Sequence, residues 1–151
     1  MIKVKLGELE VIINNLSQVM NSEGIPFNTG YWLAKIAKKL LEEIEIYNEA
    51  RIKICKEYSN KDENGNPKII YEKDDKGNDI LDKSRFDINN IDKFNEQLNL
   101  LKDTEIELNF NQIKKSDFGK AMPKPIFLVP LTEFIIEDSI IETVKPNLKI
   151  V

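Results

Sequence analysis

Two aromatic side chains and several cations lie close together in one proline-free stretch, and they are the residues best suited to ligand chemistry. Aromatic faces stack on nucleobases, and lysines at the start of a helix hold phosphate groups. The candidate ligand site consists of Tyr31, Trp32, Lys35, Lys38 and Lys39, with Arg51 further along the same stretch. We call the first five residues the aromatic–lysine cluster. The pattern is compatible with a nucleotide or another small anion.

The same cluster has a structural interpretation, which we favour. Tyr31 and Trp32 would anchor the start of a helix to the core, and the lysines would form a solvated face opposed by glutamates at helical spacing. Arg51 fits this interpretation less well, because an arginine on an apolar helix face must reach solvent or find a carboxylate or a ligand anion. The ligand role of the six residues therefore stays open.

The common kinds of catalytic machinery are missing from the sequence. The chain has no histidine and a single cysteine, Cys55, so it cannot form a Ser-His-Asp or Cys-His triad, a cysteine-based zinc cluster or an intramolecular disulfide. Its six glycines form neither a P-loop nor a dinucleotide fingerprint. Adjacent carboxylates leave a carboxylate-based hydrolase as a minor alternative. We therefore expect a protein that is not an enzyme, with no catalytic residue, metal site or cofactor.

One motif resembles the start of a calcium-binding loop. Residues 60–65 read Asn-x-Asp-x-Asn-Gly, which matches the first ligands and the glycine of an EF-hand. Position twelve, where a bidentate glutamate is needed, is Tyr71, and Pro67 interrupts the loop. We interpret the segment as an Asn/Asp/Gly turn.

Length, composition and charge indicate a globular protein with a single domain, residues 1–151. Of the 151 residues, 41% are hydrophobic and 32% charged, and the net charge of -4 gives no general attraction for duplex nucleic acid or an anionic membrane. No apolar run approaches the roughly 18 residues of a membrane span, and the first residues lack the pattern of a signal peptide. With the single cysteine, these features predict a cytoplasmic protein.

Hydrophobic periodicity predicts the N-terminal elements and one long helix. Ile2, Val4 and Leu6 alternate with lysines, which indicates a strand, and a helix is expected over about 9–20. From Thr29 to about Ser59 there is no proline and no interior glycine other than Gly30, so we expect a helix of about 45 Å, capped by Asn28 or Thr29.

A second amphipathic stretch, residues 88–101, is expected to fold back on the long helix. The apolar seam of the long helix repeats every 3.5 residues and needs a partner, so the two stretches predict an antiparallel helical hairpin. Residues 60–86, with two short β-prone runs, would form a protruding hairpin at its tip. A strand over 105–110 is expected to pair with the N-terminal strand. The fold class is therefore α+β.

The last third of the chain is less regular. Prolines interrupt it, and we expect a loop or short edge strand at 126–129. Thr132 is then expected to cap a short acidic helix. The apolar residues of that helix are Phe134, Ile135, Ile136, Ile140 and Ile141.

The length difference between the two long helices bears on assembly. The longer helix has more apolar seam than the shorter one can cover, and uncovered seam favours contact with another protomer. We therefore predict a homo-oligomer.

Six segments in the same order resemble those of a known protein family. They are Lys3-Val-Lys-Leu, Tyr31-Trp-Leu-Ala-Lys-Ile-Ala-Lys, Glu49-Ala-Arg-Ile-Lys, Lys61-Asp-Glu-Asn-Gly-Asn, Phe94-Asn-Glu-Gln-Leu-Asn-Leu-Leu and Glu105-Ile-Glu-Leu. Across about two-thirds of the chain they resemble small uncharacterised proteins carried by phages and prophages of Gram-positive bacteria. The resemblance implies a phage context and assigns no catalytic residue.

Two functions follow as hypotheses. In the first, a phage protein counters host immunity by binding, either by sequestering a nucleotide-type signal or by blocking a host protein. In the second, a phage structural or assembly factor uses the helical hairpin for protein–protein contacts.

Overall fold

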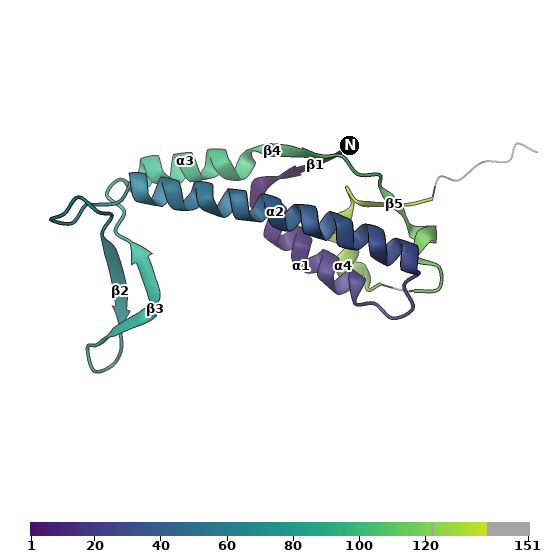
Figure 1. The fold of residues 1–151 in the computed structure, drawn as a ribbon, viewed down its shortest axis with the longest axis horizontal. Coiled ribbons are helices and arrows are strands. Elements are labelled where there is room, and N and C mark those ends of the chain that lie inside the picture. Colours follow the sequence, from purple (N-terminus) through teal and green to yellow (C-terminus); the bar gives the residue numbers. More distant parts are fainter. Residues whose placement is uncertain (122, 139–151) are drawn as a thin grey trace, which may run out of the picture.

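One helix runs along most of the molecule. The computed structural model describes residues 1–121 and 123–138, and its longest element is α2, Phe27–Glu57, which has 31 residues. At the usual rise this helix is about 46 Å long, as expected, although it begins two residues earlier than predicted (Figure 1). The fold class is confirmed: the chain is α+β, with a long helical hairpin and small two-stranded sheets.

The predicted side-chain cap of α2 was wrong. The N-cap residue is Pro26, and no side chain caps the helix. Asn28 and Thr29 already lie within the first turn, and the Thr29 hydroxyl donates instead to the backbone carbonyl of Asp117. Proline is well placed here, because it fixes an extended backbone just before the helix.

Two different helices cover α2. Helix α1, Leu9–Met20, packs against its N-terminal part, and α3, Ile91–Asp103, lies along its C-terminal part (Figure 1). At the start of α1, Glu10 lies 4.0 Å from Arg51 near the end of α2, so the two helices run antiparallel. The sequence indicated the segment of α3 as the best partner of the seam within the chain. Since α1 covers the remaining length, the difference in length between α2 and α3 no longer supports the predicted homo-oligomer.

Helix α3 begins later than predicted. Asn90 is its N-cap, and the side chain accepts a hydrogen bond from the Lys93 backbone N–H at 3.1 Å. Ile88, which was expected in this helix, instead forms an isolated antiparallel bridge with Ser59. The bridge joins the end of α2 to the chain that enters α3, and it closes the base of the protruding region.

Within the described residues, the strands form three separate two-stranded sheets. As predicted, β1, Ile2–Lys5, pairs with β4, Glu105–Leu108, and the structure shows that the two strands are antiparallel. The hairpin at the tip consists of β2, Ile69–Lys73, and β3, Asp79–Phe86. The third pair was not predicted: β5, Ile113–Lys114, lies parallel to β6, Ile135–Ile136.

The expectations for the last third were largely wrong. Instead of a loop or edge strand, α4 spans Pro125–Leu128, since proline is well suited to the first turn of a helix. A 3-10 helix, Val129–Leu131, follows it. The segment expected to be an acidic helix contains β6, although Phe134 and Ile135 are buried. Ile140 and Ile141 lie outside the described residues.

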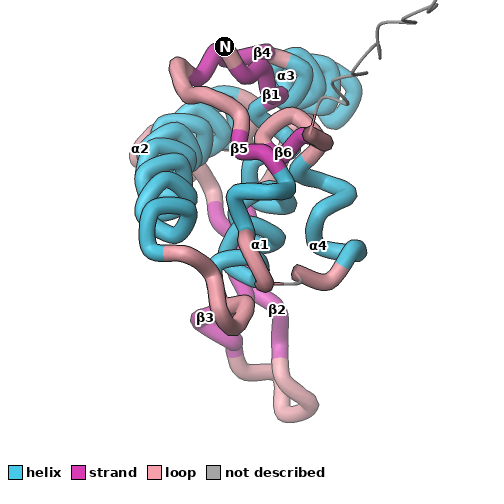
Figure 2. Tube along the Cα trace, turned by 90° about the vertical axis from the view of Figure 1, so that its right-hand side faces the viewer, coloured by secondary structure: helices cyan, strands magenta, loops and turns pink. Residues whose placement is uncertain are grey.

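The hydrophobic core lies at one end of the molecule. It is formed by β1, α1, the N-terminal two-thirds of α2 and residues of 108–121 and 123–135. Figure 2 shows these elements from the end of the molecule at which α2 begins. We call this part the body. Residues 48–104, which the structure describes in full, form the arm, made of the end of α2, the protruding region and α3. The only buried residue in the arm is Ser59.

Candidate functional site

Three residues of the aromatic–lysine cluster meet on the outer face of α2. The rings of Tyr31 and Trp32 lie edge to face, with centroids 6.0 Å apart. The Lys35 ammonium lies 4.8 Å from the Trp32 ring centroid and 5.7 Å from that of Tyr31, which is cation–π distance. Tyr31 is 54% exposed and Trp32 is 46% exposed, so neither ring anchors the helix in the core as expected.

The other lysines of the cluster face a different environment. Lys39 forms ion pairs with Glu43 at 2.9 Å and with Glu42 at 3.5 Å. The hydrogen bond to Glu43, followed by its charge, raises the pKa of Lys39 above its ordinary value. Lys39 stays charged, and two carboxylates of its own helix balance that charge. Lys38 is exposed.

Arg51 does not join the cluster. It lies about 24 Å further along α2 than Lys35 and about 160° around the helix axis. Its guanidinium lies 4.0 Å from Glu10, 3.3 Å from the Asn48 side-chain oxygen and 5.5 Å from the ring centroid of Tyr47. These contacts satisfy the arginine within the chain.

A hollow of about 350 Å³ lies beside Trp32, between the start of α2 and residues 113–117. The charged side chain in its lining is Asp117, whose carboxylate accepts the backbone N–H of Lys114 at 2.9 Å. A carboxylate opposes the binding of a phosphate. The cluster thus supplies stacking faces, but its cations do not converge on this hollow.

The calcium-like segment is a turn, as predicted. The Asp62 carboxylate accepts backbone N–H groups of Asn64 and Asn66, both at 2.9 Å, and Gly65 has a positive φ of 78°. The carboxylate oxygen that an EF-hand would offer to calcium thus holds the backbone. In the described part of the chain, no group of three His, Cys, Asp or Glu residues could hold a metal ion.

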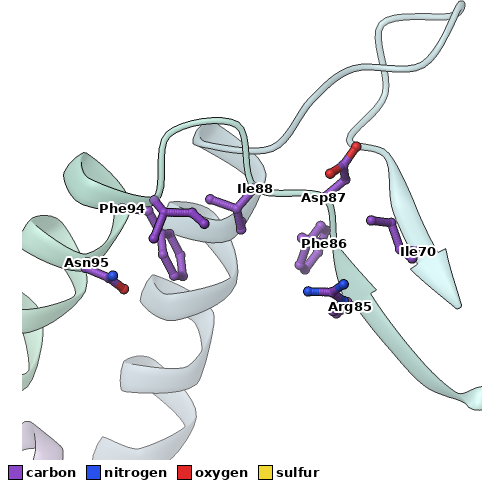
Figure 3. A pocket seen from close by; sticks show the side chains of 8 residues that line it. Ile70, Arg85, Phe86, Asp87, Ile88, Phe94 and Asn95 are labelled. Carbon is purple, nitrogen blue, oxygen red and sulfur yellow. The ribbon is translucent and has the colours of Figure 1, made fainter. Parts of the chain in front are cut away.

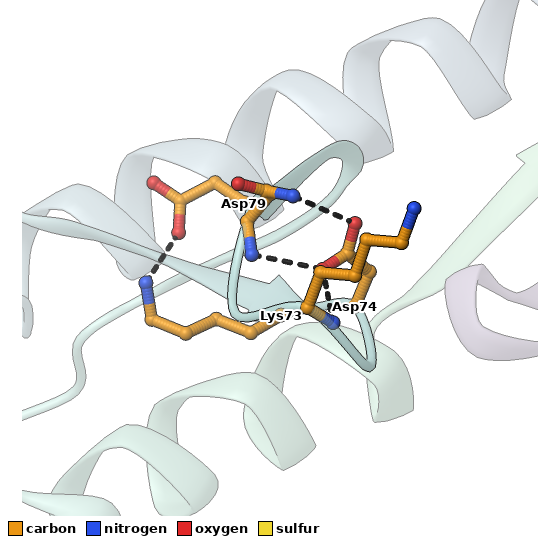
Figure 4. A network of polar contacts seen from close by, with 5 residues as sticks. Lys73, Asp74 and Asp79 are labelled. Atoms are coloured by element: carbon orange, nitrogen blue, oxygen red, sulfur yellow. Dashed lines mark hydrogen bonds and ion pairs between the residues drawn. The ribbon is translucent and has the colours of Figure 1, made fainter.

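The same turn occurs a second time at the end of the hairpin. The Asp74 carboxylate accepts the backbone N–H groups of Lys76 and Asn78, both at 2.9 Å, and Gly77 has a φ of 83° (Figure 4). The hydrogen bond from the Asn78 backbone is the main reason why the pKa of Asp74 is lowered. The shared Asp-x-x-Gly-Asn spacing of 62–66 and 74–78 is visible in the sequence, but our sequence analysis missed it.

A pocket of about 260 Å³ lies where the hairpin meets α3, and we call it the elbow pocket (Figure 3). Its apolar lining residues are Ile70, Phe86, Ile88, Ile91 and Phe94, and its polar lining residues are Arg85, Asp87 and Asn95. Sequence reasoning missed this pocket, because its walls come from three separate segments. The volume suits one or two apolar side chains.

Hydrogen bonds fix the polar edge of the elbow pocket. The Asp87 carboxylate accepts from the Asn60 side-chain amide at 3.0 Å, and the Asp87 backbone N–H donates to the Lys68 carbonyl at 2.9 Å. Arg85 is exposed and forms no ion pair within the described residues. The pocket therefore combines apolar walls with one available cation.

Comparisons of this chain with protein-family models, curated proteins and solved structures give no match. Among the helices in the described ranges, none is both long and apolar enough to cross a membrane.

Proposed function

We propose that this chain is a non-catalytic, phage-encoded binding protein that works through protein–protein contacts of its arm. The observation that carries the proposal is the burial pattern: Ser59 is the only buried residue between 48 and 104. This segment therefore contributes little to the hydrophobic core and leaves most of its side chains accessible to a partner. Contact with a partner is a physical reason for such a projection.

Exposed apolar side chains support a binding role for the arm. They are Ile52, Ile69, Tyr71, Leu81, Ile91 and Leu100. Scattered single hydrophobic residues are common on protein surfaces, but an exposed apolar side chain at the mouth of an apolar pocket is typical of an interaction site. Ile91 is 63% exposed and also lines the elbow pocket. An apolar side chain of a partner would enter this pocket, and a nearby carboxylate of the partner would pair with Arg85.

The sequence resemblance gives the proposal its context. In a phage, the partner would be a host protein whose activity is blocked in the bacterial cytoplasm. The alternative of a structural or assembly factor uses the same arm but a phage partner. Sequestration of a nucleotide signal has weaker support, because Arg51 and Lys39 have partners of their own and Asp117 lines the hollow beside Trp32.

Affinity capture from phage-infected cells tests the proposal. Ile91→Asp places a charge at the mouth of the elbow pocket, and we expect it to abolish capture of the partner. Ile46→Asp is the matched control, because Ile46 is similarly exposed, at 60%, and lies outside the arm. Equal capture by both variants would rule out the elbow pocket. Whether the captured protein comes from the host or the virion decides between blocking and assembly.

A further inference from the structure

The outer edge of β2 is uncovered. The β2–β3 sheet has two strands, so β3 covers one edge of β2, and no strand of the described residues covers the other. The hairpin projects from the ends of α2 and α3 (Figure 1). An isolated two-stranded hairpin is marginally stable in water, and an uncovered edge is a template for another strand. A strand added along β2 would therefore stabilise the hairpin.

Hydrogen bonds at both ends of β2 show which residues face the outer edge. The Lys68 carbonyl accepts the Asp87 backbone N–H at 2.9 Å, and the Asp74 backbone N–H donates to the Asn78 carbonyl at 2.9 Å. Both bonds run toward the β3 side of the hairpin. Since backbone groups of successive residues point to opposite edges of a strand, the odd-numbered residues between them direct their backbone groups outward. They are residues 67, 69, 71 and 73.

This edge of the hairpin is regular and apolar. Tyr71 is opposite Ser84 and the next residue, Glu72, is opposite Ile80, so the three extra residues of the bulge belong to β3 and β2 stays continuous. Ile69 is 45% exposed and Tyr71 is 36% exposed. A continuous apolar edge favours pairing with another strand.

The side chains on either side of Ile70 carry opposite charges. Lys68 precedes Ile70 by two residues and Glu72 follows it by two, so all three share one face. Lys68 is exposed and forms no ion pair among the residues that the structure describes. Glu72 is exposed and pairs with Lys83 of its own hairpin at 3.5 Å. The pattern of cation, apolar residue and anion is complementary to its own antiparallel copy.

We propose that a second copy of this chain pairs with it along β2, antiparallel, around a two-fold axis at Ile70. Such an axis sets one residue opposite its own copy, here Ile70 opposite the partner's Ile70. Lys68 then lies opposite the partner's Glu72 and Ile69 opposite the partner's Tyr71, and symmetry repeats both contacts. The two hairpins become one four-stranded sheet. The inference rests on the proposed binding role of the arm and names one partner of it.

Side-chain chemistry selects this register over its symmetric neighbours. An axis at Tyr71 would place Glu72 opposite the partner's Ile70, and an axis at Ile69 would place Lys68 opposite the partner's Ile70. Each of these registers sets a charge against the apolar centre of the strand twice. The axis at Ile70 instead pairs charge with opposite charge and apolar with apolar side chains, which are the favourable cross-strand pairs.

A charge-swap experiment tests the register, with mass measured by native mass spectrometry and sedimentation. We expect the unmodified chain to dimerise. Lys68→Glu and Glu72→Lys should each raise the dissociation constant about tenfold, because each puts like charges opposite each other twice. An equimolar mixture of the two variants should form heterodimers, since both opposed pairs are then complementary. Asp82→Lys, a charge change at an exposed residue of β3, should leave dimerisation unchanged.

A pair of proline variants tests the edge itself. Tyr71 and Ser84 lie directly opposite each other, and because Tyr71 directs its backbone N–H away from β3, Ser84 directs its own away from β2. Proline at either position removes an N–H that the hairpin does not use. We expect Tyr71→Pro to abolish dimerisation and Ser84→Pro to leave it unchanged. Amide chemical shifts of β3 verify that the hairpin forms in each variant.

Four results would each overturn the dimer. They are a monomeric unmodified chain at the highest soluble concentration, full dimerisation of both single charge variants, no heterodimer in their mixture, and equal dimerisation of the two proline variants. A failed dimer leaves the capture experiment with Ile91→Asp and Ile46→Asp as an independent test of the proposed function. A failed capture alongside the predicted heterodimer would show that the arm only joins copies of this chain.

Discussion

The body and the arm of this molecule are held together by different interactions. In the body, strands and helices that are distant in sequence share a core, as in the β1–β4 pairing and the packing of α1 on α2. In the arm, two Asp-x-x-Gly-Asn turns, two isolated bridges and one helix cap fix the chain locally. The contrast indicates that the body supplies stability and the arm supplies a shaped surface.

Truncation of a leucine in each region should separate the two roles most strongly. Leu40 is fully buried in the body, whereas Leu98 is half-buried in the arm. We expect Leu40→Ala to lower the free energy of unfolding by about 3 kcal/mol and Leu98→Ala to lower it by about 1 kcal/mol. Urea denaturation measures both. Equal losses would show that the arm belongs to the same core as the body.

Glycine substitutions should have opposite signs in the two regions. In the body, Gly30 is helical, and an added Cβ would meet Ile25 at an ordinary 3.8 Å, so Gly30→Ala should stabilise by about 0.5 kcal/mol. In the arm, Gly77 has open space around it but a φ of 83°, so Gly77→Ala should cost about 1 kcal/mol locally. Urea denaturation measures the first effect, and amide hydrogen exchange of β2 and β3 measures the second. A stabilised hairpin in Gly77→Ala would contradict the turn geometry.

Lowering the pH should destabilise the arm before the body. We expect this effect to be smaller than those of the substitutions above. The pKa of Asp74 is lowered in the folded chain, mainly because the Asn78 backbone N–H donates to its carboxylate. The contribution of the Asp74 carboxylate to the stability of the turn is therefore complete above the unfolded pKa of about 4. It is lost as the pH falls through the lower pKa of the folded chain. Amide chemical shifts of Gly77 and Asn78 should follow this titration while those of α1 stay constant. Asp74→Asn should remove the dependence.

Sequence reasoning succeeded where the pattern is local and long. The 31 residues of α2, the alternation of β1 and β4 and the turns of the hairpin carry their signals in consecutive residues. It failed where packing against a segment distant in sequence determines the structure. Periodicity did not reveal that α1 and α3 each cover part of the apolar seam of α2. The short run Phe134–Ile136 suited a helix or a strand, and pairing with β5 settled it.

The candidate ligand site shows the same limit and one avoidable error. Helical geometry alone places Arg51 nearly opposite Lys35, so the sequence already contained the reason why they do not converge. The elbow pocket had no such signal, because its walls lie on β2, β3 and α3 and the bulge shifts the register between the strands.

The most direct test of the arm as a binding element is to remove its tip. Residues 61–86 would be replaced by a short Gly-Ser linker, and capture from phage-infected cells would be compared with that of the full chain. We expect the partner to be lost while the free energy of unfolding changes by less than about 1 kcal/mol, because the removed segment contains no buried residue. Capture of the same partner by the shortened chain would contradict the proposal.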